Sequence, residues 1–340
     1  MNNCGSPVLF AALGLLMVGP QVACAQEKSA PSTVQVNMVI TDQALNENEE
    51  VPVLRAENVQ VSQGKNMLKV ASIIAARGDN AALQLFVLID ETCDTSIGNN
   101  LNDLRDFINA QPASTMVGVA YMSNATVQVA QNLTADHALA AKAVRLPRGT
   151  TSSMDSPYLS LVSLVKSWPQ QKVRREVLMI SDGIDRLRGE RSPGSPTAQP
   201  LTSARGMRPV ETPRTMPTIS IDADTASRAS QQYGVIVHGV YSPGIGRLGR
   251  NAWEAQLGQS GVAKIADETG GEYFALGTQT PVTFKPYLDR IQIILNNQYF
   301  LVFEVNPGKK DALQRVRIST TLTNVDIAAA DNVWVPTGGA

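Results

Sequence analysis

The middle of the chain alternates two kinds of apolar pattern. Almost continuous apolar runs are typical of strands buried on both faces of a parallel sheet, and they occupy 83–89, 116–122, 176–181, 235–240 and 273–275. Segments with apolar residues at helical spacing lie between or after these runs, at 101–108, 158–165, 226–233, 262–269 and 284–296. Strands that alternate with helices predict an α/β fold with a doubly wound, mostly parallel sheet of the Rossmann-like kind.

The stretch between the second and third of these strands predicts two further elements. Residues 125–129 are expected to return as an edge hairpin beside the strand at 116–122. Thr134 is expected to cap a helix that runs through Leu139 and Val144, because a threonine hydroxyl can accept a hydrogen bond from a free N–H of the first turn.

Both ends of the chain show the alternation of apolar and polar residues that half-buried strands have. It appears at 34–40, 58–62 and 68–74, and again at 299–305 and 315–322. Isolated hairpins are marginally stable in water, so the two ends are expected to pair into one small β satellite. The predicted division is a small β unit at 34–78, an α/β domain at 80–297 and a C-terminal β segment at 298–336.

The first 25 residues have the pattern of a signal peptide and contain no Asp, Glu, Lys or Arg. Their apolar run, Val8–Val18, is too short to span a bilayer, and Ala23-Cys24-Ala25 fits a cleavage signal. Residues 26–33 then form a polar leader, and the mature protein is expected to be periplasmic or secreted, with no transmembrane segment. The alternative is a lipoprotein that carries its lipid on Cys24.

Charge changes this picture in only one region. The chain has 29 basic and 30 acidic residues, a net charge of −1, so it lacks the basic excess that a nucleic-acid-binding protein usually shows. Residues 186–217, however, contain six Arg, two Glu, six Pro and no aromatic residue. This composition predicts a flexible basic loop, either a solvated insertion or a segment that binds a partner.

Two acidic residues stand at the predicted carboxyl ends of neighbouring strands, where open α/β sheets carry their ligand sites. Asp90 ends the run LFVLID, and Asp182 follows VLMIS. The simplest interpretation is that each carboxylate accepts hydrogen bonds from backbone amides. The residues around them support a second interpretation, in which they are part of a metal site.

The sequence around these acids resembles a von Willebrand factor A (vWA) domain and its metal-ion-dependent adhesion site, which reads Asp-x-Ser-x-Ser, a distant Thr, and an Asp commonly followed by Gly. The matching elements here are Asp90-Glu91-Thr92-Cys93-Asp94 and Asp182-Gly183, with the Thr supplied from Gly149-Thr150-Thr151. The segments REVLMISDGIDR, IADETGGEYFAL and VDIAAADNVWVP also look like a bacterial exported "VWFA-related" family. That likeness spans roughly residues 35–336 and implies the fold, but no agreed biochemical activity.

The resemblance implies a Mg²⁺ or Ca²⁺ ion, held by oxygen atoms from three loops. The matching positions are Asp90, Thr92, Asp94, Thr150, Thr151 and Asp182. Asp94 departs from the pattern, since a carboxylate stands where a neutral hydroxyl is expected, and Ser153 competes with the two threonines for the distant position. The alternative is a site without metal, in which Asp94 caps the following helix.

The resemblance favours a binding or adhesion module over an enzyme, with a protein partner that offers an acidic side chain to the metal. One alternative is a metal-independent structural or assembly factor that uses the fold as a scaffold. Another is an exported metal-dependent hydrolase, for which the sequence offers no supporting base.

Three remaining signals are better explained by packing than by chemistry. The glycine motif at 244–249 lacks the helix and the acid of a dinucleotide site. His238 lies in a buried strand and is expected to be a satisfied interior residue, and Cys93 is expected to pack as a small side chain.

Overall fold

The computed structural model describes residues 33–44, 53–169, 171, 173–189, 220–246 and 252–337. The predicted signal peptide, all of the leader except Thr33, and all of the basic loop except residues 186–189 lie outside the described residues. None of the described helices is long and apolar enough to cross a membrane.

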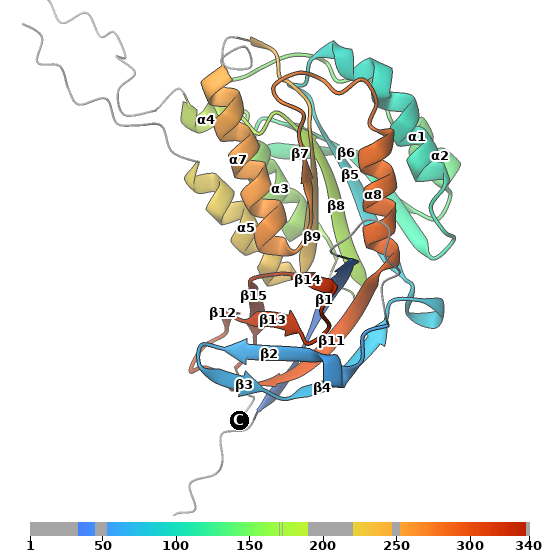
Figure 1. The fold of residues 1–340 in the computed structure, drawn as a ribbon. Helices are drawn as coiled ribbons and strands as arrows, with labels where there is room; N and C mark the ends of the chain where they lie inside the picture. Colours follow the sequence, from blue (N-terminus) through green and yellow to red (C-terminus); the bar gives the residue numbers. More distant parts are fainter. Residues whose placement is uncertain are drawn as a thin grey trace, which may run out of the picture.

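A six-stranded sheet forms the centre of the larger domain (Figure 1). Its strands, in spatial order, are β10 (Tyr273–Phe274), β9 (Val235–Tyr241), β8 (Arg174–Ser181), β5 (Leu83–Asp90), β6 (Thr115–Ser123) and β7 (Thr126–Thr134). All neighbours are parallel except β7, which runs antiparallel to β6 at the edge. Every residue of β5, β8 and β9 is buried, as their continuous apolar runs predict, so the doubly wound α/β fold is confirmed.

Helices cover both faces of this sheet and enclose two separate apolar cores (Figure 1). One face carries α1 (Leu101–Asn109), which follows the 3-10 helix η3 (Thr95–Asn100), together with α2 (His137–Lys142) and α8 (Lys285–Asn296). The other face carries α3 (Pro157–Ser167), α5 (Ile221–Tyr233) and α7 (Ala252–Thr269). A short helix, α4 (Arg186–Gly189), follows β8.

The predicted cap of α2 is wrong. Thr134 is the last residue of β7, which extends beyond the predicted 125–129, and its hydroxyl accepts a hydrogen bond from Asp136 N at 3.0 Å. Asp136 is the cap instead, because its carboxylate accepts from Leu139 N at 3.0 Å. The hydroxyl of Thr134 therefore shapes the turn that precedes the helix.

Helix α7 begins at Ala252, well before the predicted Val262. Two glycines interrupt its apolar pattern, and both allow close packing. A Cβ on Gly258 would collide with the backbone of Asp182, and one on Gly261 would collide with the hydroxyl of Tyr158. Because these positions hold glycine for contact rather than apolar side chains, a periodicity search misses the first half of the helix.

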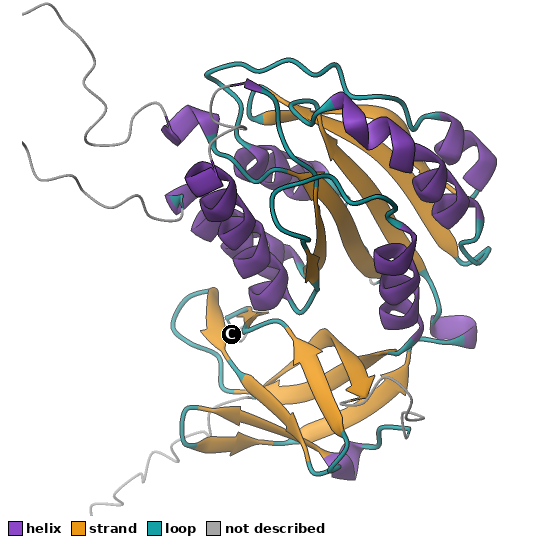
Figure 2. Cartoon of the chain, turned by 45° about the horizontal axis from the view of Figure 1, so that its top comes forward, coloured by secondary structure: helices purple, strands orange, loops and turns teal. Residues whose placement is uncertain are grey.

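The two chain ends form one β domain, as predicted (Figure 2). Its four-stranded sheet has the order β14 (Val325–Ala329), β1 (Val34–Ala44), β11 (Gln298–Val305) and β4 (Val70–Ala75). A three-stranded sheet contains β13 (Arg317–Thr320), β2 (Val59–Gln63) and β3 (Asn66–Leu68), and β12 (Ala312–Arg315) pairs with β15 (Asn332–Val335). Two 3-10 helices, η1 (Ala56–Asn58) and η2 (Gly78–Asn80), lie in the connections.

The predicted strand at 315–322 is divided into β12 and β13, because Val316 leaves the ladder. Its side chain is buried in the apolar core of the β domain, and its N–H bonds to Asp331 O at 3.0 Å. The interruption lets consecutive residues join two different sheets.

The β domain lies below the amino-terminal edge of the central sheet (Figure 1). Arg174, the first residue of β8, helps to join the two parts. Its Nη1 donates to Leu295 O at 2.7 Å and to Gln298 Oε1 at 2.8 Å, and its Nη2 donates to Ala81 O at 2.7 Å. Asp90 and Asp182 stand at the opposite edge of the same sheet.

Candidate functional site

Asp90 and Asp182 meet where the strand order of the central sheet reverses. Strands β5 and β8 are neighbours, and the chain continues from them to opposite sides of the sheet. This switch point is the usual ligand position in an open α/β sheet. Both acids are buried here, with 2% and 0% of their surface exposed.

Asp90 is held by three hydrogen bonds from protein donors. Its Oδ1 accepts from the backbone N of Thr92 at 2.9 Å and from the Thr92 hydroxyl at 2.8 Å. Its Oδ2 accepts from the hydroxyl of Ser181 at 2.7 Å. Burial and the nearby Asp182 raise the pKa of Asp90 to about 6, although Arg186 and the hydrogen bonds oppose this shift.

Asp182 forms a buried, two-pronged ion pair with Arg186. The guanidinium Nη2 lies 2.6 Å from Oδ2 and its Nη1 lies 3.3 Å from Oδ1, and only 4% of Arg186 is exposed. Gly183 adopts a φ of +68°, which favours glycine, and the chain then turns into α4. The prediction that the flexible loop begins at Arg186 is therefore wrong for this residue, because its guanidinium binds Asp182, four residues earlier in the chain.

The segment 242–246 covers this pair. Ile245 N donates to Thr92 O at 2.9 Å, and Asp94 N donates to Pro243 O at 2.7 Å, so the segment is tied to the loop after β5. Gly244 lies directly on Asp182, because a Cβ at this position would overlap the Asp182 carboxylate. Gly244 of the glycine motif thus serves a close backbone contact, and residues 247–249 of the motif lie outside the described residues.

The remaining predicted ligands make no hydrogen bond to the buried pair among the described residues. Asp94 Oδ1 accepts from Ser96 N at 2.9 Å and caps η3, which is the alternative role considered for it. Thr150 and Thr151 are both exposed, and neither side chain hydrogen-bonds to the two strand-end acids within the described part of the chain. The structure therefore brings Asp90, Thr92 and Asp182 together but gives the other three predicted ligands different surroundings.

This arrangement does not fit the Mg²⁺ or Ca²⁺ site that the resemblance implies. Such an ion needs about six oxygen ligands, several of them usually water for Mg²⁺. Here Asp90 already accepts three protein hydrogen bonds, and Asp182 already binds a cation, Arg186. A guanidinium supplies the positive charge that a metal would supply in an adhesion site.

Glu91 anchors a neighbouring loop and was not singled out by the sequence. It is buried, and it accepts from both terminal nitrogens of Arg145 and from Arg148 N, the latter at 2.6 Å. Arg145 also lies over the ring of Tyr121, 3.8 Å from its centroid. This cluster fixes the chain before Thr150 against the end of β5.

Two residues with reactive side chains have structural roles. Burial, with Asp90 and Asp182 adding to it, raises the pKa of the Cys93 thiol well above its usual range, so the thiol stays protonated. His238 is fully buried, and its Nε2 lies 2.8 Å from Glu176 Oε2 while its Nδ1 accepts from Glu272 N at 3.2 Å. Both residues behave as the packing interpretation expects.

The strand order, read from the antiparallel edge, is β7-β6-β5-β8-β9-β10, with helices on both faces and an acid ending β5 at the switch point. The central domain is vWA-like. No family model and no curated protein matches the sequence. The fold assignment therefore rests on the strand order and on the helices that cover both faces of the sheet.

Several solved structures are similar in fold. An aerotolerance-related membrane protein from Bacteroides fragilis has 12% identity and a TM-score of 0.42, over 63% of this chain and 99% of that one. The SpRpn10 VWA domain has 13% identity and a TM-score of 0.36, over 62% and 96%. The type V pili tip protein Mfa5 from Porphyromonas gingivalis has 9% identity and a TM-score of 0.39, over 91% and 68%. At these values, no activity or partner is transferred.

Proposed function

We propose that this protein is an exported protein-binding module whose vWA-like domain works without a bound metal ion. The observation that carries the proposal is the buried ion pair between Asp182 and Arg186. An adhesion-type metal site needs an open coordination position for an acidic group of the partner. Segment 242–246 closes over the pair, so recognition of an acidic side chain through a metal finds no support here.

The surface around the closed site supports a protein partner. Loops at this edge of the sheet and the first turn of α7 expose several large apolar side chains: Leu146, Met154, Trp253, Leu276 and Val282. Val282 is 95% exposed and Leu276 is 67% exposed, and both lie in the connection between β10 and α8. A group of exposed apolar residues on one edge is typical of protein–protein contact surfaces.

Metal independence can be tested by thermal unfolding of the mature chain in chelator and then in Mg²⁺, Ca²⁺ or Mn²⁺. A ligand of the folded state at 100 times its dissociation constant adds about 2.7 kcal/mol, which a melting curve resolves. We expect no rise in the unfolding midpoint with any of the three ions. A rise that disappears in Asp90→Asn would overturn the proposal.

The role of the exposed apolar residues at this edge of the sheet can be tested by capture of proteins from the source cells in chelator. A variant with both Leu276→Asp and Val282→Asp is expected to lose a partner that the unaltered chain retains. Met67→Asp is the control, because Met67 is similarly exposed but lies on β3 of the other domain. Capture that requires a divalent ion, or that survives the double substitution, would contradict this mode of binding.

A further inference from the structure

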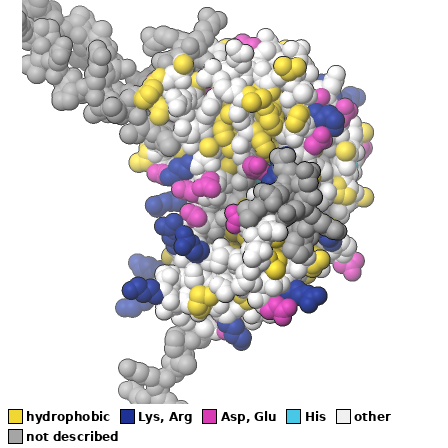
Figure 3. Space-filling view, viewed as in Figure 1, with side chains coloured by type: hydrophobic (Ala, Val, Ile, Leu, Met, Phe, Trp, Pro, Cys, Tyr) yellow, Lys and Arg dark blue, Asp and Glu magenta, His cyan; other side chains and the backbone are white. Residues whose placement is uncertain are grey.

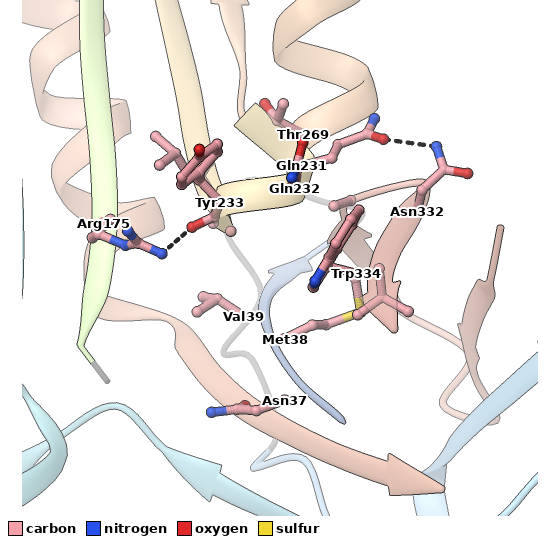
Figure 4. A pocket seen from close by; sticks show the side chains of 15 residues that line it. Asn37, Met38, Val39, Arg175, Gln231, Gln232, Tyr233, Thr269, Asn332 and Trp334 are labelled. Carbon is pink, nitrogen blue, oxygen red and sulfur yellow. Dashed lines mark hydrogen bonds between the residues drawn. The ribbon is translucent and has the colours of Figure 1, made fainter. Parts of the chain in front are cut away.

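A cavity of about 210 Å³ lies between the two domains, at the edge of the sheet opposite the site described above. Its walls come from β1 and β15 of the β domain and from α5, β8 and β9 of the central domain (Figure 4). Trp334 and Met38 form apolar wall on one side, and Arg175 reaches in from β8 on the other. The cavity combines an aromatic wall with a largely neutral polar lining, to which uncharged polar groups are added by Asn37, Gln231, Gln232, Thr269 and Asn332.

Arg175 brings a charge to this cavity that the protein does not balance. Only 7% of the residue is exposed, and its Nη2 donates to Tyr233 O at the end of α5. Within the described residues, its Nε and Nη1 have no hydrogen-bond partner. Burial lowers the pKa of Arg175, and no carboxylate among the described residues offsets that effect.

The lining of the cavity is selective for negative charge. Among the described residues that line it, none is Asp or Glu, and Arg175 is the single charged side chain. Its polar neighbours are uncharged, and Asn332 Nδ2 already donates to Gln231 Oε1 at 2.7 Å. A negative charge that pairs with Arg175 must therefore come from a group that is not part of the lining.

A second cavity at the same junction shows the contrast. It is lined by Asp267, Glu272, Asp326 and Asp331 together with Arg315 and Arg317. Figure 3 shows acidic and basic side chains meeting on this side of the molecule, where the two domains join. Its four carboxylates outnumber its two guanidinium groups, so it offers no unmatched cation to an anionic ligand.

We propose that the cavity beside Arg175 binds a small monocarboxylate with a flat apolar body. The carboxylate would accept a charge-assisted hydrogen bond from the guanidinium Nη2, which keeps a second N–H beside its bond to Tyr233 O, because Nε and Nη1 expose almost no surface to the cavity. The apolar body would lie against Trp334 and Met38. A ligand so placed contacts both domains at once.

The surroundings favour a single negative charge over a phosphate dianion. Arg175 is one cation, and it stands beside the carboxyl end of α5, where the helix dipole is negative. Arg175 would neutralise one negative charge of a dianion, and the negative end of the helix dipole would repel the other. The aromatic and aliphatic walls likewise suit an organic acid better than an inorganic ion.

Titration of the full chain, followed by tryptophan fluorescence and calorimetry, tests this site. The probes are acetate, benzoate and indole-3-acetate, with benzamide as the uncharged counterpart of benzoate and inorganic phosphate as the competing anion. We expect saturable binding of at least one aromatic acid and binding of benzamide weaker on the order of tenfold or more, because the charge-assisted hydrogen bonds are lost. Saturable binding by none of the three acids, or equal binding of benzoate and benzamide, would overturn the proposal without any variant.

Variants then locate the site. Arg175→Gln is expected to weaken the aromatic acid on the order of tenfold, and Arg175→Lys should retain part of the affinity. Arg228→Gln is the matched control, because Arg228 lies on the exposed side of α5. Trp334→Phe should remove most of the fluorescence change while calorimetry still detects binding. Unaltered affinity in Arg175→Gln, or phosphate binding tighter than every carboxylate, would exclude the assignment.

Discussion

Strand β8 has a buried arginine near each of its ends, and the two are in opposite electrostatic situations. Arg186, just beyond the carboxyl end, makes two contacts with Asp182 and is covered by Gly244. Arg175, near the amino end, lines a cavity and has two nitrogen atoms without a partner. The two arginines are buried to a similar degree, so burial alone does not distinguish a structural arginine from a ligand-binding one. The distinction is whether a carboxylate of the protein pairs with the guanidinium.

The comparison also explains why the expected ligand site and the proposed one lie at different edges of the sheet. At the carboxyl edge, the two strand-end acids Asp90 and Asp182 are already satisfied by partners among the described residues. At the amino edge, the β domain closes over the sheet and leaves one cation unmatched in a cavity. The added domain therefore creates the site that the vWA-like domain alone would lack.

The largest expected effect comes from breaking the matched pair. Arg186→Met removes the cation and leaves Asp182 buried without a partner, which costs about 3–5 kcal/mol of unfolding free energy. Urea unfolding measures it. Lys285→Ala is the control, because the Lys285–Asp289 pair has the same spacing of four residues but side chains that are 71% and 60% exposed, and its loss should cost less than about 1 kcal/mol. Equal losses in the two variants would show that Arg186 does not stabilise the site.

A smaller loss is expected when the cover of the pair is disturbed. Gly244→Ala places a methyl group against the Asp182 carboxylate, and overpacking of this kind costs about 1–3 kcal/mol. Gly308→Ala is the control, since the nearest atom to its Cβ would be 3.5 Å away, and it should change stability by less than about 0.5 kcal/mol. A tolerated Gly244→Ala would mean that segment 242–246 is not seated on the pair.

Much of the fold could be predicted because it depends on local apolar patterns. The runs of β5, β8 and β9 indicate a parallel sheet directly, and the marginal stability of lone hairpins correctly joins the two chain ends. The missed features depend on contacts between distant segments. Gly258 and Gly261 have no apolar side chain to reveal α7, and Val316 interrupts a strand because of a bond to Asp331.

The site was predicted in part for the same reason. Strand ends identify Asp90 and Asp182, but the sequence does not show which cation faces them. Arg186 lies four residues after Asp182, a spacing that could have suggested the pair, yet it begins a segment whose composition predicts a flexible loop. Arg175 carries no sequence signal at all, because its cavity exists only where the β domain packs on the sheet.

A buried carboxylate without a cationic partner provides a further test of the contrast between matched and unmatched charges. Asp42 on β1 is buried, neither of its carboxylate oxygens has a partner among the described residues, and burial raises its pKa to about 6. Since the folded state then holds the proton more tightly than the unfolded state, stability should fall as pH rises from about 4 to about 6. Asp90, with a pKa also raised to about 6, contributes in the same direction.

Asp42→Asn should remove its share of this decline, on the order of 1–2 kcal/mol between pH 4 and pH 7. Urea unfolding at several pH values measures the difference from the unaltered chain. Asp79→Asn, at an exposed position in η2, should leave the decline unchanged. A decline as steep in Asp42→Asn as in the unaltered chain would show that Asp42 is ionised at no cost, and hence matched by a charge.

The smallest effect is expected from the unmatched arginine itself. Arg175→Gln loses one hydrogen bond to Tyr233 O, but it also removes a cation that is buried without compensation, so without ligand the stability should change by less than about 1 kcal/mol. The adjacent Arg174 is a demanding control, because Arg174→Gln breaks two buried hydrogen bonds and one partly buried hydrogen bond at the domain junction and should cost about 2–3 kcal/mol. Urea unfolding with and without an aromatic acid completes the contrast: the acid should stabilise the unaltered chain but not Arg175→Gln. A large loss in Arg175→Gln without ligand would instead make this arginine as structural as Arg186, and the distinction between matched and unmatched charges would fail.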